Sequence, residues 1–136
     1  MVINLTKGSV VVRELRVARN FFERLRGLIG SEPLGIGEGF LIPHCRGIHT
    51  FGMDYAIDAI YLDDEGKIVS ALENLPPNRF GTINFKARSV LELPAGAIRR
   101  SKSNVGDLLN LRQPLISAAA PRRVFRNKFL ASYQTG

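Results

Sequence analysis

The residue types best suited to chemistry lie close together in one short stretch of the chain. Both histidines and the only cysteine fall within six positions, as His44, Cys45 and His49. Imidazole, thiolate and carboxylate groups together can bind zinc or iron, or can form a Cys–His nucleophile pair. In an extended segment Cys45 and His49 point to one face and His44 to the other. A metal or nucleophile site would therefore combine Cys45 and His49 with a carboxylate such as Asp58.

The spacing of these residues is typical of neither a structural zinc site nor a catalytic pair. Zinc ligands usually come in pairs such as Cys-x-x-Cys or His-x₃₋₅-His, whereas Cys45 and His49 are followed by no second pair. The glycine-rich stretch 35–39 leads into an apolar run and not into a helix whose N-terminus could receive a phosphate. We therefore expect no metal and no other cofactor.

Asp58 lies in an apolar run, residues 57–62, whose two faces are both largely hydrophobic. Such a run is typical of a strand covered on both sides, where an acid needs hydrogen-bond donors. The candidate donors are His49, Thr50, Arg24 and backbone amides. We expect Asp58 to order the loop at 44–54 in this way, so that an Asn substitution is mild while Ala or Leu is severe.

A mainly β domain must position these residues. Short β-branched or apolar runs separated by Gly and Pro turns predict strands. The expected strands are residues 9–12, 39–43, 57–62, 67–72, 89–93 and 105–111. Residues 63–66 predict a hairpin turn, with Gly66 suited to a positive φ. The pattern is that of a single-domain β-sandwich or a partly closed barrel.

One packed amphipathic helix is expected near the N-terminus. Asn20 is suited to its N-cap, Glu23 follows as in a capping box, and Gly30 is suited to its C-terminal end. The apolar stripe of this helix consists of Phe21, Phe22, Leu25, Leu28 and Ile29. Residues at this spacing share a helical face, which we expect to pack on the sheet.

The composition indicates one soluble globular domain. The chain has 136 residues, 45% of them hydrophobic and 23% charged, and its mean hydropathy is near zero. These values exclude a disordered chain and a membrane-spanning one. The lone Cys45 fits a reducing compartment, and no signal peptide is visible, so we expect a cytoplasmic protein.

The positive charge lies in the second half of the chain. Residues 1–68 hold 8 Lys and Arg against 9 Asp and Glu, whereas residues 69–136 hold 11 against 3. We expect a domain over residues 1–120 and a basic tail over residues 121–136. The tail's candidate contacts to an acidic protein, nucleic acid or anionic lipid are Arg122, Arg123, Arg126 and Lys128.

Several blocks, in this order, carry a resemblance to a known family. They are RLRGL at 24–28, GEGFLI at 37–42, CRGIHTFGM at 45–53, the pairs and turn at 57–69, VLELPAG at 90–96 and VGD at 105–107. Together they resemble the domain of unknown function 192 family, the UPF0127-type proteins. The resemblance implies a small, mainly β domain with one packed helix and no established activity. Many members have a Trp-Met-Lys-Asn type segment near His49, so the family implies no ligand role for it.

Three functions follow as hypotheses. The first is a non-enzymatic binding or accessory module whose contact surface is formed by loops 31–39, 44–54 and 93–96. Its candidate polar cluster consists of Arg24, Glu38, Cys45, His49, Thr50, Asp58 and Glu92. The second is a metal-dependent or hydrolytic enzyme centred on Cys45, His49 and Asp58. The third is an electrostatic binder of nucleic acid or anionic membrane through the basic C-terminal half.

Overall fold

The fold is built from two β-sheets and two short helices in the computed structural model, which describes residues 1–111. The strands are β1 (Val2–Asn4), β2 (Ser9–Val12), β3 (Glu14–Val17), β4 (Glu38–Pro43), β5 (Ile57–Leu62), β6 (Ile68–Leu75) and β7 (Ser89–Pro94). The helices are α1 (Phe21–Arg26) and α2 (Ala97–Ser101). β1 and β2 form an antiparallel pair, and the other strands form a sheet in the order β3-β4-β7-β5-β6. In this sheet β3 runs parallel to β4, and the remaining neighbours are antiparallel.

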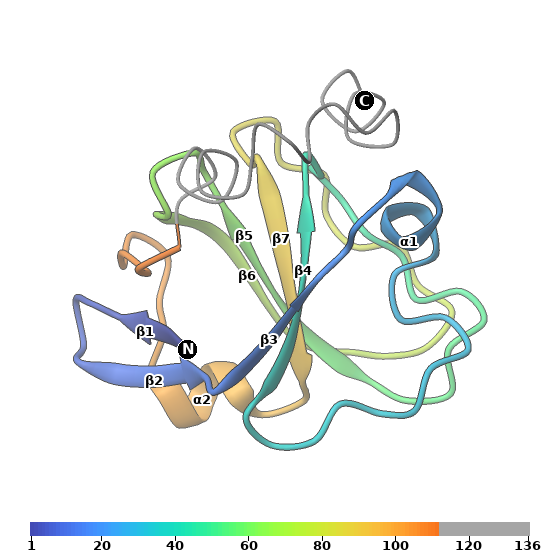
Figure 1. Cartoon of the computed structure of the whole chain (residues 1–136), viewed down its shortest axis with the longest axis horizontal. Coiled ribbons are helices and arrows are strands. Elements are labelled where there is room, and N and C mark those ends of the chain that lie inside the picture. The colour runs from blue at the N-terminus through green and yellow to red at the C-terminus, as the bar shows by residue number, and fades with distance from the viewer. Residues whose placement is uncertain (112–136) are drawn as a thin grey trace.

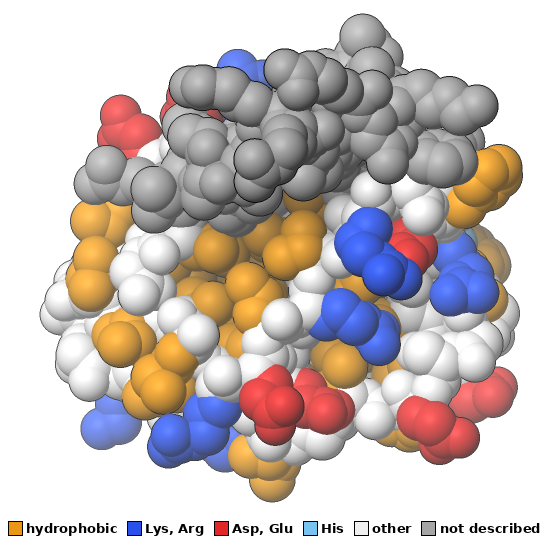
Figure 2. All heavy atoms as spheres, viewed as in Figure 1, with side chains coloured by type: hydrophobic (Ala, Val, Ile, Leu, Met, Phe, Trp, Pro, Cys, Tyr) orange, Lys and Arg blue, Asp and Glu red, His pale blue; other side chains and the backbone are white. Residues whose placement is uncertain are grey.

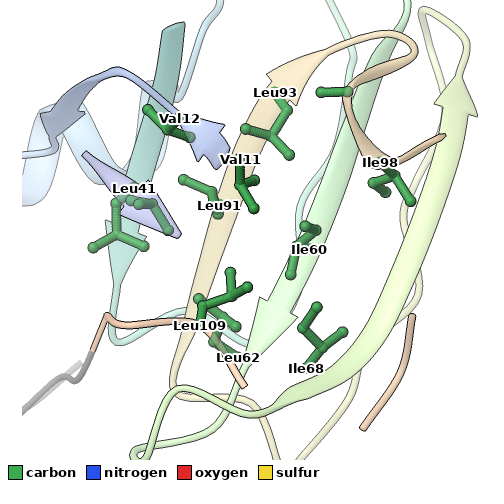
Figure 3. Close-up of a cluster of buried hydrophobic side chains, with 12 residues drawn as sticks. Val11, Val12, Leu41, Ile60, Leu62, Ile68, Leu91, Leu93, Ile98 and Leu109 are labelled. Atoms are coloured by element: carbon green, nitrogen blue, oxygen red, sulfur yellow. The ribbon is translucent and has the colours of Figure 1, made fainter. Parts of the chain in front are cut away.

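Both faces of the five-stranded sheet are covered (Figure 1). We call the face under β1, β2 and α2 the hairpin face, and the face under α1 and the long loops the loop face. Side chains such as Leu62 and Leu91 pack on the hairpin face together with Ile98 of α2 (Figure 3). Phe40 and Tyr61 are buried on the loop face. All six residues of β5 are buried, which confirms the expectation of a strand covered on both sides.

The structure confirms a mainly β, sandwich-like fold, and the described strands close no barrel. The predicted hairpin is present, because Asp63 N–H donates to the Lys67 carbonyl and Gly66 has a φ of +90°. The strand expected at 105–111 is wrong: in that segment only Leu108 and Leu109 make isolated bridges. The reason is Asp107, whose carboxylate accepts a hydrogen bond from the Asn104 N–H and bends the chain into a turn.

The N-terminal helix is shorter than expected. Asn20 is its N-cap and accepts the Glu23 N–H, as predicted, but α1 ends at Gly27 and not at Gly30. Gly27 has a φ of +58° and a ψ of −127°, a conformation that favours glycine and stops the helix. The expected packed stripe is confirmed only in part: Leu28 is buried in the core and Ile29 packs against it, whereas Phe22 and Leu25 are 69% and 63% exposed. A helix of fewer than two turns presents too little surface to bury a full stripe.

Three elements have no counterpart among the expected ones: β1, β3 and α2. Each is only three to five residues long, and each is held by its neighbour rather than by its own pattern. The expected boundary at residue 120 and the basic tail over 121–136 lie outside the described residues. Within residues 1–111, no helix is long and apolar enough to cross a membrane.

Asp58 connects three segments on the hairpin face. Its side chain is completely buried, and its Oδ2 accepts the backbone N–H groups of Gly96 at 3.1 Å and Ile98 at 2.9 Å. Its Oδ1 accepts the Asn74 N–H at 2.9 Å. The hydrogen-bond donors to Asp58 are therefore backbone amides, one of the candidates expected from the sequence. They belong to β6 and to the start of α2. The expectation that Asp58 orders the 44–54 loop is wrong, because that loop lies over the other face.

Replacing Asp58 by Ala should destabilise the fold by about 3 kcal/mol, because three buried N–H groups lose their acceptor. Asn should be intermediate rather than mild, since one amide oxygen can serve only one side of the cluster and its NH₂ group then faces an N–H donor. Chemical denaturation measures both, with the exposed Asp64→Ala as the control. Stabilities within about 0.5 kcal/mol of each other for the Asn and Ala variants and the parent chain would contradict this role for Asp58.

Candidate functional site

Two long irregular segments, residues 44–53 and 76–88, lie side by side over the loop face; we call them the paired loops. Backbone hydrogen bonds join them along their length. The bonds run from Cys45 N–H to the Arg88 carbonyl, from Gly81 N–H to the Ile48 carbonyl and from Thr50 N–H to the Arg79 carbonyl. The two segments therefore behave as one ladder although neither is a regular strand.

Thr50 fastens this ladder at one end. Its side chain is fully buried, and its hydroxyl donates to the Pro76 carbonyl at 2.6 Å and accepts the Arg79 N–H at 3.0 Å. Both partners belong to the opposite segment of the paired loops. Thr50, one of the predicted polar residues, is thus a structural link and does not face a cavity.

Tyr61 fastens the paired loops to the sheet. Its hydroxyl donates to the Thr82 carbonyl, and burial raises the pKa of Tyr61 to about 12. Gly81 lies directly over it: a Cβ at position 81 would stand 2.9 Å from the Tyr61 hydroxyl and 3.1 Å from Ile48. Only glycine permits this close approach of the loop backbone to the sheet.

A cleft of about 280 Å³ opens between α1, the end of β4 and the first of the paired loops. Its lining residues are Arg24, Leu25, Arg26, Gly27, Ile42, His44, Cys45, Arg46, Gly47, Ile48, His49 and Glu92. We call it the Glu92 cleft. Four members of the predicted polar cluster meet here, from three separate parts of the chain.

Glu92 reaches the cleft from the middle of the sheet. In the register of β7 it stands opposite Phe40 of β4 and Ala59 of β5, so its side chain is on the loop face. It is 1% exposed, and its Oε1 has no hydrogen-bond partner among the described residues. A Cβ at position 27 would stand 3.5 Å from Oε1 and 3.7 Å from Oε2. The carboxyl group therefore lies beneath Gly27, the end of α1, where a side chain is missing.

Burial raises the pKa of Glu92 to about 8. Arg24 and Arg26 line the same cleft. At neutral pH the group is therefore mostly a neutral carboxylic acid, which offers one O–H donor and a carbonyl acceptor. A buried carboxyl group without a partner costs stability and marks a candidate ligand site.

Burial also favours the neutral forms of two neighbouring side chains, Cys45 and His44. Burial raises the pKa of the Cys45 thiol, and the thiol donates to the Gly47 carbonyl at 3.0 Å. Burial lowers the pKa of His44, and the nearby Arg24 and Arg88 lower it further. A thiol held in its protonated form is a poor nucleophile and a poor metal ligand.

Because its acids are neutral, the net charge of the Glu92 cleft comes from three arginines. Arg24 and Arg26 extend from α1, and Arg46 extends from the paired loops on the other side. Planar guanidinium groups bind carboxylate and phosphate oxygens through two parallel hydrogen bonds. The cleft thus combines a neutral hydrogen-bonding floor with a cationic lining, an arrangement that favours an oxyanion.

His49 lies at the edge of the cleft. Its Nδ1 accepts the backbone N–H of Phe51 at 3.2 Å, which places the ring proton on Nε2. Its ring centroid is 5.9 Å from that of Phe51. No hydrogen bond to Cys45 is formed within the described structure, so the two do not constitute a nucleophile–base pair.

The structure separates the residues of the metal and enzyme alternative. Asp58 projects from the hairpin face of the sheet, whereas Cys45 packs on the loop face. Within residues 1–111, no three His, Cys, Asp or Glu side chains stand close enough to hold a metal ion. Two-sided coverage of β5 is the physical reason, because alternating side chains on a strand face opposite layers.

Glu38 and two of the expected loops are also displaced from the cleft. Glu38 is at the opposite end of β4, where its Oε1 accepts the Gly35 N–H at 2.7 Å. Since β4 and β7 are antiparallel, loops 31–39 and 93–96 lie at that end and loop 44–54 lies at the other. The three loops therefore do not form the single contact surface that we expected.

Sequence reasoning missed Arg26 and Arg46 as cleft residues, and it placed His44 on the wrong side of the chain. Strand alternation predicted that His44 would point away from Cys45. His44 has a φ of +54°, so the chain turns there and the alternation ends. The preceding Pro43, the last residue of β4, was the signal that could have indicated this turn.

A second and larger hollow, of about 630 Å³, lies between β3 and α1. Figure 2 shows this face, with Lys and Arg side chains over β3 and α1 and acidic side chains beside them. Arg19 and Glu23 of its lining pair with each other at 3.0 Å. No buried polar atom lacks a partner in this hollow within the described residues, so the Glu92 cleft is the better candidate site.

Comparison with known proteins agrees with this fold. The model of the DUF192 family, described as "Uncharacterized ACR, COG1430", matches residues 2–111. A UPF0127 protein of Thermococcus sibiricus is 33% identical over 111 residues, which are 79% of this chain and 71% of the relative. A UPF0127 protein of Pyrococcus furiosus is 34% identical over 110 residues, covering 79% and 94%. The crystal structure of a protein of unknown function from Novosphingobium aromaticivorans superposes with a TM-score of 0.62 at 21% identity, covering 71% and 74%.

The free energy of unfolding should depend on the protonation of Glu92. The pKa is about 8 in the folded protein and near 4.5 in the unfolded chain, so between these values only the folded state holds the proton. Stability therefore falls as the pH rises through this window, by about 1.4 kcal/mol per pH unit, and levels off above pH 8.

Chemical denaturation between pH 5 and 9 measures this effect when the parent chain is compared with Glu92→Gln, whose amide does not ionise. The variant should gain relative stability of about 4 kcal/mol between pH 5 and 8. The exposed Glu65→Gln serves as the control and should follow the parent chain. Parallel pH curves for Glu92→Gln and the parent would show that Glu92 ionises freely.

Proposed function

The chain belongs to the DUF192 family of uncharacterised proteins, and from this starting point we propose that it is a non-enzymatic binding module that holds a small oxyanion-bearing molecule in the Glu92 cleft. The observation that carries the proposal is the Glu92 carboxyl group, which is buried and lacks a partner at its Oε1. A fold tolerates such a group at a cost in stability, and ligand sites are where that cost is regularly met.

The lining of the cleft supports an anionic ligand. Arg24 and Arg46 stand on opposite sides of it, and the one carboxyl group among its lining residues, Glu92, is mostly protonated at neutral pH. A protonated Glu92 can donate its O–H to an oxygen of the ligand. With about 280 Å³, the cleft is at the small end of the range for ligand sites, which suits a phosphate ester or a short dicarboxylate.

The state of the side chains favours binding over catalysis. Cys45 is held as a thiol by burial and by its bond to the Gly47 carbonyl, and His49 is not bonded to it. The enzyme alternative needs an activated nucleophile, and these contacts provide none. The lone cysteine further supports a place in the reducing cytoplasm for this module.

Calorimetric titration of the full chain with inorganic phosphate and with succinate tests the proposal, with glycerol and putrescine as neutral and cationic probes. We expect binding of the anions only. Arg46→Gln should weaken it about tenfold, because it removes charge-assisted hydrogen bonds. Arg13→Gln makes the same charge change at the far end of β4, beside Gly37, and should leave the affinity unchanged.

The pH dependence provides a second test of the same site. The charge of succinate is constant above pH 7, so its affinity should fall above pH 8 only because Glu92 ionises and repels it. In Glu92→Gln this fall should disappear. Equal binding of all four probes, or anion binding that Arg13→Gln weakens as much as Arg46→Gln, would refute an oxyanion site in the Glu92 cleft.

A further inference from the structure

The outer surface of the paired loops exposes large apolar side chains. Phe80 and Phe85 are 78% and 80% exposed, Ile83 is 64% exposed and Phe51 is 41% exposed. The rings of Phe51 and Phe80 touch edge to face, with centroids 4.7 Å apart. Three phenylalanines and an isoleucine left in water on one pair of joined segments form a patch of the kind that marks an interaction surface.

The same segments carry cations without acids. Arg79, Lys86 and Arg88 belong to the second segment and Arg46 to the first, and all four are exposed. No Asp or Glu occurs from residue 39 to residue 53, and none occurs from residue 74 to residue 91. None of the four takes part in an ion pair of the described structure. The apolar patch is therefore embedded in uncompensated positive charge.

We propose that the paired loops dock on an anionic lipid surface, with Phe80, Ile83 and Phe85 inserted among the acyl chains and the cations at the headgroups. Transfer of apolar side chains from water into the membrane lowers the free energy, and each Lys or Arg near an anionic leaflet adds an electrostatic attraction. The docking surface is separate from the interior of the Glu92 cleft, so this inference goes beyond the proposed binding of a small oxyanion.

A lipid surface fits these side chains better than a single-stranded nucleic acid does. Stacking on bases requires free aromatic faces. Ile83 has no ring, and Phe51 and Phe80 already contact each other edge to face. Insertion into a membrane interface needs only exposed apolar surface next to cations, and all four apolar side chains supply it.

Co-sedimentation of the full chain with phosphatidylcholine vesicles, with and without phosphatidylserine, tests the docking. Binding should require phosphatidylserine. The double variant Phe80→Ser/Phe85→Ser should lose about tenfold in affinity, because it removes most of the inserted surface. The matched control is Ile36→Ser/Val105→Ser, which removes two other exposed apolar side chains, 81% and 62% exposed, away from the paired loops and should bind as the parent does.

The cations are tested separately. Arg79→Gln/Lys86→Gln should lose about fivefold in affinity for each charge removed. Arg100→Gln/Lys102→Gln makes the same change in net charge on and beside α2, at the opposite end of β7, and should have little effect. Arg46 is left unchanged because it also lines the Glu92 cleft. All of these positions are on the surface, and thermal melts confirm that each variant is folded.

Three results would overturn the proposal. One is the absence of binding to vesicles that contain phosphatidylserine. Another is an equal loss in the loop variants and in their matched controls, which would indicate attraction through the overall net charge of +7. The third is binding of an oligouridine that the loop variants abolish while vesicles are not bound, which would assign the surface to nucleic acid. The proposal is supported if affinity for phosphatidylserine vesicles falls in the loop variants and not in their matched controls.

Discussion

Two-sided burial of the five-stranded sheet is the constraint on which the rest of the structure depends. A carboxyl group in a central strand of such a sheet is removed from water on either face, so it must find donors or stay protonated. Asp58 and Glu92 meet this constraint differently. Asp58, on the hairpin face, is surrounded by three backbone N–H groups and helps to position α2. Glu92, on the loop face, lacks such donors and retains an unpartnered oxygen.

This difference separates a structural acid from a candidate binding acid. The N–H groups that satisfy Asp58 come from the chain itself, at the start of α2 and in β6, and leave no acceptor for a ligand. Glu92 faces the end of α1, where Gly27 has no side chain to cover it. A residue that the fold does not satisfy can be satisfied by a molecule that enters from outside, and the surrounding arginines select the charge of that molecule.

The paired loops connect this site with the outer surface of the protein. Thr50 and Tyr61 fasten them to each other and to the sheet, so the loops are held rigidly although they contain no regular strand. Their inner side, through Cys45 and His49, lines the cleft. Their outer side carries the exposed phenylalanines. The proposed ligand site and the proposed docking surface are thus positioned by the same hydrogen bonds.

The local sequence pattern was sufficient to predict those elements whose structure is decided by residues close to one another in the chain. Alternating or continuous apolar runs predicted β2, β4, β5, β6 and β7, and the Asn20 cap and the 63–66 turn were predicted correctly because each depends on bonds within a few residues. The same local signals also showed that Asp58 would be buried.

Which acid faces which partner was decided only by the tertiary structure. The antiparallel register of β4 and β7 separates Glu38 and two predicted loops from the cleft, and the chain turns at the positive φ of His44, so that His44 lines the same cleft as Cys45. β3 forms because β4 offers it a parallel partner, and α1 ends early because Gly27 adopts a positive φ that stops the helix. From sequence, Cys45, His49 and Asp58 looked like one site and Glu92 like one polar residue among several. Strand order and register are set by contacts between distant segments, and those contacts have no signature in local periodicity.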